Sequence, residues 1–213
     1  MNIIFDFDGV IINSHKVKTL AFYNVFKVYG DLYGLKAKKF HLEHIGKSRY
    51  FKFKYILKNI LKSKVTKKKI LNLDKEFDHF VQKRIKKMYP SHHLIRFLKN
   101  KNNLFNIYIS TGTPQANIVK TLKEKKILKY FDKVYGSPKS KIKNIKMIKK
   151  NDKKNDKKNI FIGDSFEDFK AAKNSNIEFI LKINSENLFL RKKANLNTIN
   201  SFKFLEKKIK LLK

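Results

Sequence analysis

A chain of 213 residues with 42% hydrophobic residues can bury one substantial core and leaves room for a smaller inserted domain. It has no cysteine, which excludes disulfides and thiolate metal sites, and no apolar run approaches the roughly 18 residues of a membrane span. The formal net charge of +34 favours anionic partners, but only four of the 51 basic residues are arginine, the residue that pairs bidentately with phosphates and bases.

The lysine content has an explanation other than function. The chain is also rich in Asn, Ile, Phe and Tyr and poor in Gly and Pro, as expected for an AT-rich genome. We therefore expect mutational bias to explain most of the charge, and we do not expect nucleic acid to be the main partner.

Asp6 and Asp8 interrupt the first apolar stretch, so no signal peptide is expected and a cytoplasmic location without a membrane anchor is predicted. The sequence does not indicate the oligomeric state.

Short apolar runs alternate with helical patterns along most of the chain. The apolar runs predict strands over residues 2–6, 104–109, 133–135, 159–163 and 177–182. The helical patterns cover residues 114–126, 140–150, 165–174 and 201–212. Such alternation is typical of an α/β fold, a mostly parallel sheet covered by helices on both faces. In such sheets the reactive groups lie beyond the carboxyl ends of the strands.

Residues 14–90 interrupt this alternation and have mainly helical patterns. We therefore expect a core formed by residues 1–13 and 91–213 and a helical insert formed by residues 14–90. An insert that leaves the core just after Asp8 is expected to lie over the site. The lysine-rich stretch 149–158 is predicted to be a solvated loop.

The stretch Asp6 to Ile11, DFDGVI, follows a β-favouring apolar run. Two carboxylates one residue apart at a strand end converge on one point, which is costly unless a cation lies between them or one of them holds a proton. Either arrangement points to chemistry on an oxygen-rich, anionic substrate. The same pattern also occurs in ordinary turns and calcium loops, so its structural context decides between these interpretations.

The next polar group follows the predicted strand 104–109. Ser110 places a hydroxyl at the strand end, and free backbone N–H groups next to a helix N-terminus suit a phosphate. Thr113 and Pro114 have the residue types of a helix cap and a first helical residue. We favour a functional role for Ser110 and a simple cap for Thr113.

A lysine and two further acids complete the pattern. Lys141 opens a predicted helix and is preferred over Lys139 as the lysine of the site. Asp164 ends another apolar strand, as Asp6 ends the first. Asp168 follows in the first helical turn, where it could also complement the helix dipole.

Taken in order, these strand ends carry two acids, a hydroxyl, a lysine and two more acids. This order resembles that of the haloacid dehalogenase superfamily of hydrolases, most of which are phosphatases. The matching residues are Asp6-Phe7-Asp8-Gly9-Val10, Ser110-Thr111-Gly112, Lys141 and Gly163-Asp164-Ser165-x-x-Asp168. The resemblance spans nearly the whole chain and implies a Rossmann-like, doubly wound parallel sheet with an inserted small helical cap.

The resemblance also implies roles for the acids. Asp6 would be the nucleophile that becomes an aspartyl-phosphate, and Asp8 would be the general acid and then the general base. Mg²⁺ would be held by Asp6, the backbone carbonyl of Asp8 and Asp164, with Asp168 in support. The dehalogenases that give the family its name lack the second acid of the first motif, so the presence of Asp8 favours phosphoryl chemistry.

The remaining core motifs are implied to bind phosphate. Ser110, Thr111, Gly112 and Lys141 would hold the transferring phosphoryl group and neutralise its charge.

The insert resembles the helical cap of the phosphoglycolate phosphatase and β-phosphoglucomutase branch. Within it, Arg49 could bind a substrate carboxylate or second phosphate, or it could form a salt bridge between cap and core. His41 and His44 could bind a metal ion, but we favour surface histidines at a helix end.

The sequence thus predicts a Mg²⁺-dependent phosphatase acting on a small phosphorylated metabolite. A phosphosugar mutase of the same superfamily shares the core residues and stays an alternative. A nucleic-acid-end phosphatase is permitted by the charge and disfavoured by a closing cap. A phosphonate hydrolase would need a reactive cap lysine, and the insert has too many lysines to exclude this alternative. A binding module without turnover is disfavoured by the intact acids.

Overall fold

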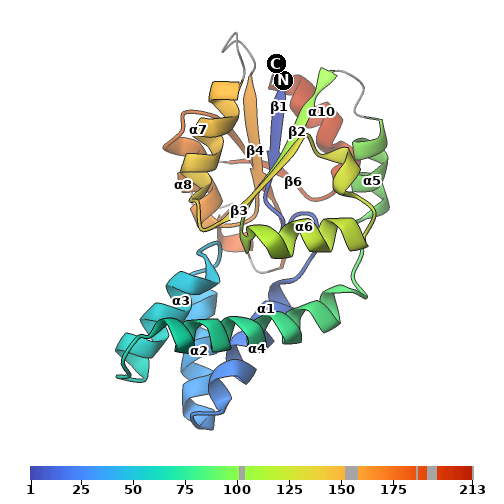
Figure 1. The fold of residues 1–213 in the computed structure, drawn as a ribbon. Coiled ribbons are helices and arrows are strands. Elements are labelled where there is room, and N and C mark those ends of the chain that lie inside the picture. Colours follow the sequence, from blue (N-terminus) through green and yellow to red (C-terminus); the bar gives the residue numbers. More distant parts are fainter. Residues whose placement is uncertain (101–103, 152–157, 186, 191–195, 213) are drawn as a thin grey trace. The chain divides into compact units, whose positions relative to one another are not determined.

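The computed structural model describes residues 1–100, 104–151, 158–185, 187–190 and 196–212. The chain divides into two compact units (Figure 1). The core unit consists of Met1–Ile12 and Tyr89–Lys213, and the helical unit consists of Asn13–Met88. Within the described part of the chain, no helix is both long and apolar enough to span a membrane.

The core unit is built on a six-stranded sheet in which every neighbouring pair is parallel. Its strands are β1 (Asn2–Phe5), β2 (Asn106–Pro114), β3 (Lys133–Ser137), β4 (Asn159–Gly163), β5 (Glu178–Lys182) and β6 (Asn197–Ile199). Their order is β3-β2-β1-β4-β5-β6, so the winding reverses between β1 and β4. Ligands of doubly wound sheets bind at this reversal, beyond the carboxyl ends of the strands. The predicted α/β fold with a doubly wound parallel sheet is confirmed.

Helices cover both faces of this sheet (Figure 1). The helices of the core unit include α5 (His92–Lys99), α6 (Gln115–Glu124), η3 (Leu128–Tyr130), α7 (Lys141–Asn151), α8 (Phe166–Lys173), η4 (Phe202–Phe204) and α10 (Leu205–Leu211). On one face, Ile4 and Phe161 pack with Ile145 of α7 and Ala172 of α8. On the other face, the ring of Phe5 lies 6.3 Å from that of Phe97 in α5. Burial on both faces explains why β1 and β4 are almost continuously apolar.

The helical unit has an aromatic core of its own. Its elements are α1 (His15–Lys27), α2 (Asp31–Glu43), α3 (Arg49–Tyr55), the π-helix η1 (Ile56–Ile60) and α4 (Lys67–Ile85). Phe22 of α1, Phe53 of α3 and Phe77 of α4 meet with ring centroids 4.9 to 5.7 Å apart. This packing joins three helices in a segment whose sequence is otherwise rich in lysine.

The predicted strand 104–109 is wrong at both ends. β2 begins at Asn106 and continues to Pro114, because its pairing with β3 resumes at Pro114 and Ser137 after a shift in register. Ser110 therefore lies inside β2, not in a loop beyond it. Pro114 keeps an extended ψ of 143° and is the cap residue of α6, so it is not the first helical residue.

Other differences have local causes. α5 was not predicted, although Ser91 caps it by accepting a hydrogen bond from the Leu94 N–H at 3.3 Å. β6 was also missed, because three residues are too short for a recognisable apolar run. The predicted helix 201–212 divides into η4 and α10. The predicted loop 149–158 begins within α7, and its residues 152–157 lie outside the described residues.

Candidate active site

Asp6 and Asp164 directly follow two neighbouring strands. β1 pairs with β4 so that Phe5 lies opposite Ile162, and the Asp6 N–H donates a hydrogen bond to the Ile162 carbonyl at 2.9 Å. Both aspartates are 3% exposed. The strand pairing therefore places two buried carboxyl groups at the carboxyl ends of β1 and β4, the two strands between which the winding reverses.

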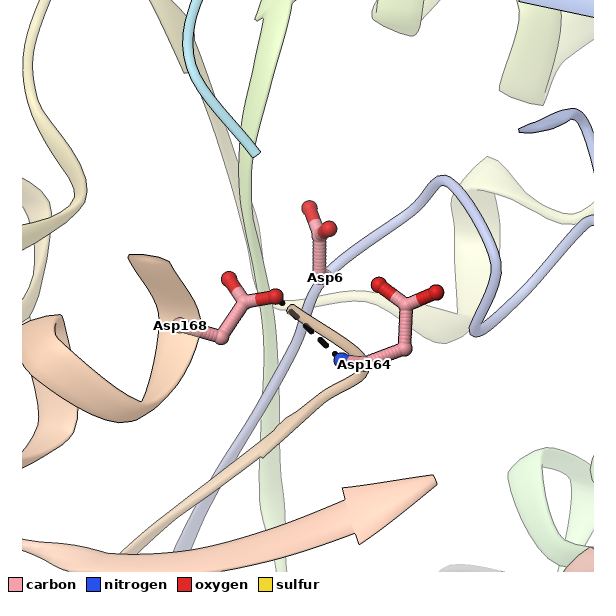
Figure 2. Close-up of side chains that lie close together, drawn as sticks. All are labelled: Asp6, Asp164 and Asp168. Carbon is pink, nitrogen blue, oxygen red and sulfur yellow. Dashed lines mark hydrogen bonds between the residues drawn. The ribbon is translucent and has the colours of Figure 1, made fainter. Parts of the chain in front are cut away.

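Asp168 joins them from the first turn of α8. Its Oδ2 accepts hydrogen bonds from the N–H groups of Asp164 at 3.2 Å and Ser165 at 3.0 Å, and Ser165 caps the helix in return. Gly163 permits this approach, because a Cβ at that position would lie 2.4 Å from the Asp168 Cβ. One carboxyl oxygen of each of Asp6, Asp164 and Asp168 lies within 4.8 Å of the other two. Figure 2 shows the three side chains gathered at this point.

Lys141, the first residue of α7, links two of these acids. Its Nζ lies 3.1 Å from Asp6 Oδ2 and also forms an ion pair with Asp168. The alternative, Lys139, is exposed, and its Nζ lies 3.7 Å from the sulfur of Met147. Of the two candidate lysines, the structure brings Lys141 to the acids.

Burial and neighbouring charges shift the pKa values of two groups in this cluster. Burial raises the pKa of Asp6 to about 8; Lys141 opposes this shift, and the neighbouring acids add to it. Burial lowers the pKa of Lys141, but the negative charges of Asp168 and Asp6 outweigh burial and raise that pKa above its usual range. The raised pKa favours the protonated form of Asp6, and a protonated carboxyl group is a poor nucleophile.

Two asparagines after β5, which were not predicted from the sequence, form hydrogen bonds with Asp164. The side-chain amide of Asn184 donates to Asp164 Oδ2 at 2.8 Å, and that of Asn187 donates to the Asp164 carbonyl oxygen at 2.8 Å. Asn187 Oδ1 in turn accepts from the Asn184 N–H at 2.9 Å. Their only signal in the sequence is their place just after the fifth strand.

The predicted phosphate-binding residues lie in the second half of β2. Ile109 pairs with Phe5, so Ser110 lies level with Asp6 on the neighbouring strand. The buried Ser110 hydroxyl accepts a hydrogen bond from the Asn144 amide of α7 at 3.2 Å. Thr111 is buried, and Gly112 is partly exposed. The phosphate-binding roles of these residues stay predictions.

Asp8 lies in a turn just beyond β1. Gly9 has a φ of 77°, and its N–H donates to the Ile12 carbonyl at 2.7 Å. The hydroxyl of Thr113 donates to Asp8 Oδ2 at 2.9 Å. The predicted role of Thr113 as a simple helix cap is wrong, because the following residue, Pro114, caps α6.

A family model described as haloacid dehalogenase-like hydrolase matches residues 3–182, a span that contains the whole acidic cluster. The chain belongs to this family. The predicted superfamily and the predicted enzyme class, a hydrolase, are confirmed. Among curated proteins, none matches the chain significantly in sequence.

Solved structures share the fold of this haloacid dehalogenase-like hydrolase over nearly its full length. β-Phosphoglucomutase from Clostridium difficile is 22% identical, with a TM-score of 0.76 over 99% of this chain and 97% of its own. A predicted phosphoglycolate phosphatase from Haemophilus somnus 129pt is 15% identical, with a TM-score of 0.73 over 96% of both chains. A mutant CbbY from Rhodobacter sphaeroides, in complex with xylulose-(1,5)bisphosphate, is 13% identical, with a TM-score of 0.73 over 95% of this chain and 94% of its own. At these identities the likeness shows the fold alone.

The acidic cluster of the hydrolase fits a divalent cation. All its donors are carboxyl oxygens, the ligands that Mg²⁺ prefers. Asp6 Oδ1 is buried and has no hydrogen-bond partner among the described residues, a costly state that a cation would relieve. A dication would also add positive charge beside the three acids and favour the ionised form of Asp6.

Arg49 of the hydrolase lies in the helical unit, at the start of α3. Its Nε lies 2.6 Å from Asp74 Oδ1, and its Nη1 lies 3.3 Å from Asp78 Oδ1. Both acids belong to α4, so these ion pairs fasten two helices of one unit together. The sequence pattern left open a salt bridge to the core and did not indicate these two partners. The role of Arg49 in substrate binding stays a prediction.

The expectation that both histidines of the helical unit lie on the surface is wrong for His41. This residue is 4% exposed, stacks on Phe22 at 4.5 Å, and places Nδ1 2.9 Å from the Nζ of buried Lys52. Burial, followed by the charge of Lys52, holds the pKa of His41 well below its usual range. His44 stacks on Phe40 at 4.0 Å. In the described part of the chain, neither histidine belongs to a group of three or more possible metal ligands.

We predict that Arg49→Ala destabilises the hydrolase by about 1–3 kcal/mol, because it leaves two partly buried carboxylates without this cation. Urea denaturation, followed by a signal that reports the helical unit, measures the loss. Arg84→Ala, an exposed arginine of α4, is the matched control and should have a smaller effect. Unchanged stability with a selective loss of kcat/KM for a metabolite would instead assign Arg49 to substrate binding.

Proposed function

We propose that this hydrolase is a Mg²⁺-dependent phosphatase that hydrolyses a small phosphorylated metabolite through an aspartyl-phosphate on Asp6. The observation that carries the proposal is the placement of Lys141, which lies 3.1 Å from Asp6 and pairs with Asp168 in a buried cluster at the winding reversal. A carboxylate nucleophile, a fixed cation and a set of oxygen donors are the parts that phosphoryl transfer needs at one point.

In the first step, a carboxylate oxygen of Asp6 attacks phosphorus. A bond forms between Asp6 and the phosphoryl group, and the electron pair of the breaking P–O bond passes to the leaving oxygen. Asp8 gives its proton to that oxygen, so the product leaves as a neutral alcohol.

In the second step, water attacks the phosphorus of the aspartyl-phosphate. Asp8, now ionised, takes a proton from the water while the electron pair of the breaking bond returns to Asp6. Inorganic phosphate leaves, and both aspartates regain their starting state.

Fixed charges stabilise both steps. The Lys141 ammonium offers positive charge beside Asp6, and Ser110 offers a hydroxyl on the neighbouring strand. Bound Mg²⁺ would be held by Asp6, Asp164 and the Asp8 carbonyl, with Asp168 in support, and would supply charge neutralisation for the phosphoryl oxygens.

We propose the helical unit as the cap that governs substrate choice. Core residues of this kind act on the phosphoryl group common to all substrates, so discrimination must come from groups that contact the rest of the molecule. The structural neighbours include a β-phosphoglucomutase, a predicted phosphoglycolate phosphatase and a CbbY in complex with xylulose-(1,5)bisphosphate. These names favour a small phosphorylated metabolite.

A panel of phosphorylated metabolites tests the proposal, with phosphate release and product identity measured with and without Mg²⁺. We expect Mg²⁺-dependent phosphate release from a narrow class of small phosphate esters. Formation of an isomeric phosphosugar without phosphate release would make the protein a mutase. A strong preference for phosphorylated oligonucleotide ends would make it a nucleic-acid-end phosphatase.

A further inference from the structure

The contact between Thr113 and Asp8 joins two parts of the core unit that are 105 residues apart in the chain. The threonine hydroxyl donates to Asp8 Oδ2 at 2.9 Å. Thr113 lies near the end of β2, just before α6. A hydroxyl in this position, before a helix, normally serves as the helix cap. Here Pro114 occupies the cap position, so the hydroxyl is directed to Asp8 instead.

Thr113 is held in place by its own backbone. It lies in β2, and its N–H donates to the Thr111 hydroxyl at 3.2 Å. The next residue, Pro114, pairs with Ser137 of β3. The hydroxyl therefore projects from a fixed strand end and not from a mobile loop.

The backbone around Asp8 is held differently. The turn from Phe7 to Ile12 is closed by N–H donation from Ile11 and Ile12 to the Phe7 carbonyl, at 2.9 and 3.1 Å. These bonds fix the main chain but leave the torsions of the Asp8 side chain to be set by side-chain contacts. A hydrogen bond from a fixed donor restricts those torsions.

We propose that Thr113 is a positioning residue, which holds the Asp8 carboxyl group in the orientation for proton transfer. The inference rests on the proposed function, in which Asp8 protonates the leaving oxygen and later accepts a proton from water. Proton transfer requires the carboxyl oxygen within hydrogen-bond reach of the reacting oxygen, so its rate depends steeply on this orientation.

The positioning role has a signature that general destabilisation lacks. Phenolate is a poorer leaving group than nitrophenolate, so phenyl phosphate needs the proton of Asp8 more than para-nitrophenyl phosphate does. The two esters have nearly the same shape. Loss of positioning should therefore reduce turnover of phenyl phosphate selectively, whereas a structural defect should affect both esters alike.

The test compares kcat/KM for the two esters in three variants with saturating Mg²⁺. Thr113→Val keeps the shape of the side chain and removes the hydrogen-bond donor. We expect kcat/KM for phenyl phosphate to fall by roughly ten- to a hundredfold, as for the loss of one hydrogen bond to a charged group. The fall in kcat/KM for para-nitrophenyl phosphate should be much smaller. Thr113→Ser keeps the hydroxyl and should restore most of the phenyl phosphate activity. Thr121→Val removes a hydroxyl that donates to the Asn117 carbonyl within α6, and should leave the ratio of the two activities unchanged.

Asp8→Asn separates this inference from the proposed function. If Asp8→Asn shows the selective loss and Thr113→Val lowers both esters equally, or neither, the positioning role is overturned and the proposed function stands. If Asp8→Asn lacks the selective loss, the assigned role of Asp8 is wrong and the inference falls with it. A Thr113→Val enzyme faster than wild type would mean that the contact holds Asp8 away from the substrate, which also overturns the positioning role.

Discussion

Replacing Asp6 with asparagine is expected to abolish turnover of para-nitrophenyl phosphate while leaving the fold intact. An amide oxygen is a far weaker nucleophile than a carboxylate, and loss of a nucleophile costs at least about a thousandfold in kcat. The fold should tolerate the change, because asparagine has nearly the same shape and Asp6 is already biased to its neutral form by a pKa of about 8. Steady-state turnover, with thermal unfolding recorded in parallel, measures both effects.

The matched control for this variant is Glu206→Gln, which makes the same chemical change at an exposed acid of α10. It should have wild-type turnover. Activity of Asp6→Asn close to that of the control would remove Asp6 as the nucleophile and, with it, the aspartyl-phosphate mechanism.

Removal of divalent metal is expected to abolish activity, and Mg²⁺ should restore it. Burial and the neighbouring acids raise the pKa of Asp6 to about 8, which favours the protonated form that cannot act as a nucleophile. A nearby dication lowers the pKa of a carboxyl group by favouring its charged form. Chelation followed by titration with Mg²⁺ measures the requirement, and undiminished turnover in a thoroughly metal-stripped sample would contradict the account.

Two variants are expected to weaken the affinity for Mg²⁺ to different degrees. Asn184→Ala removes a donor that holds Asp164 Oδ2 at 2.8 Å, and loss of such an outer partner typically weakens metal affinity by about ten- to a hundredfold. Asp164→Ala removes a proposed ligand and should weaken affinity more. Calorimetric titration with Mg²⁺ reads the affinity independently of turnover, and equal affinity in both variants and the wild type would exclude the proposed site.

The acids of the site could be predicted from the sequence because the strands that they follow are easily recognised. Strands buried on both faces are continuously apolar, so a charged residue at the end of one is conspicuous. Asp6 and Asp164 satisfy this description, and the parallel pairing of β1 with β4 places both at the carboxyl ends of the strands. Lys141 carried less information, since it is one of many lysines, and it was preferred only for its place at a helix start. The family resemblance, not the residues alone, supplied the roles.

The contacts that the sequence did not predict are all long-range. Thr113 has the sequence pattern of a cap, but in the structure it lies in β2 and its hydroxyl donates to Asp8. Arg49 meets its partners on α4 through the packing of two helices. His41 is buried because the face of α2 that carries it packs on Phe22. Local patterns indicate elements, whereas these contacts depend on how elements pack.

Covalent labelling of Asp6 tests the central claim most directly. In an Asp8→Asn enzyme, para-nitrophenyl phosphate should still phosphorylate Asp6, because its leaving group needs little protonation, while the hydrolysis step lacks its base. After acid quench and digestion, we expect a phosphoryl group on the peptide that contains Asp6, formed with a burst of about one nitrophenolate per enzyme molecule. Turnover by the wild-type enzyme with no phosphoryl group on that peptide in the Asp8→Asn enzyme, or with the label on another residue, would contradict the account.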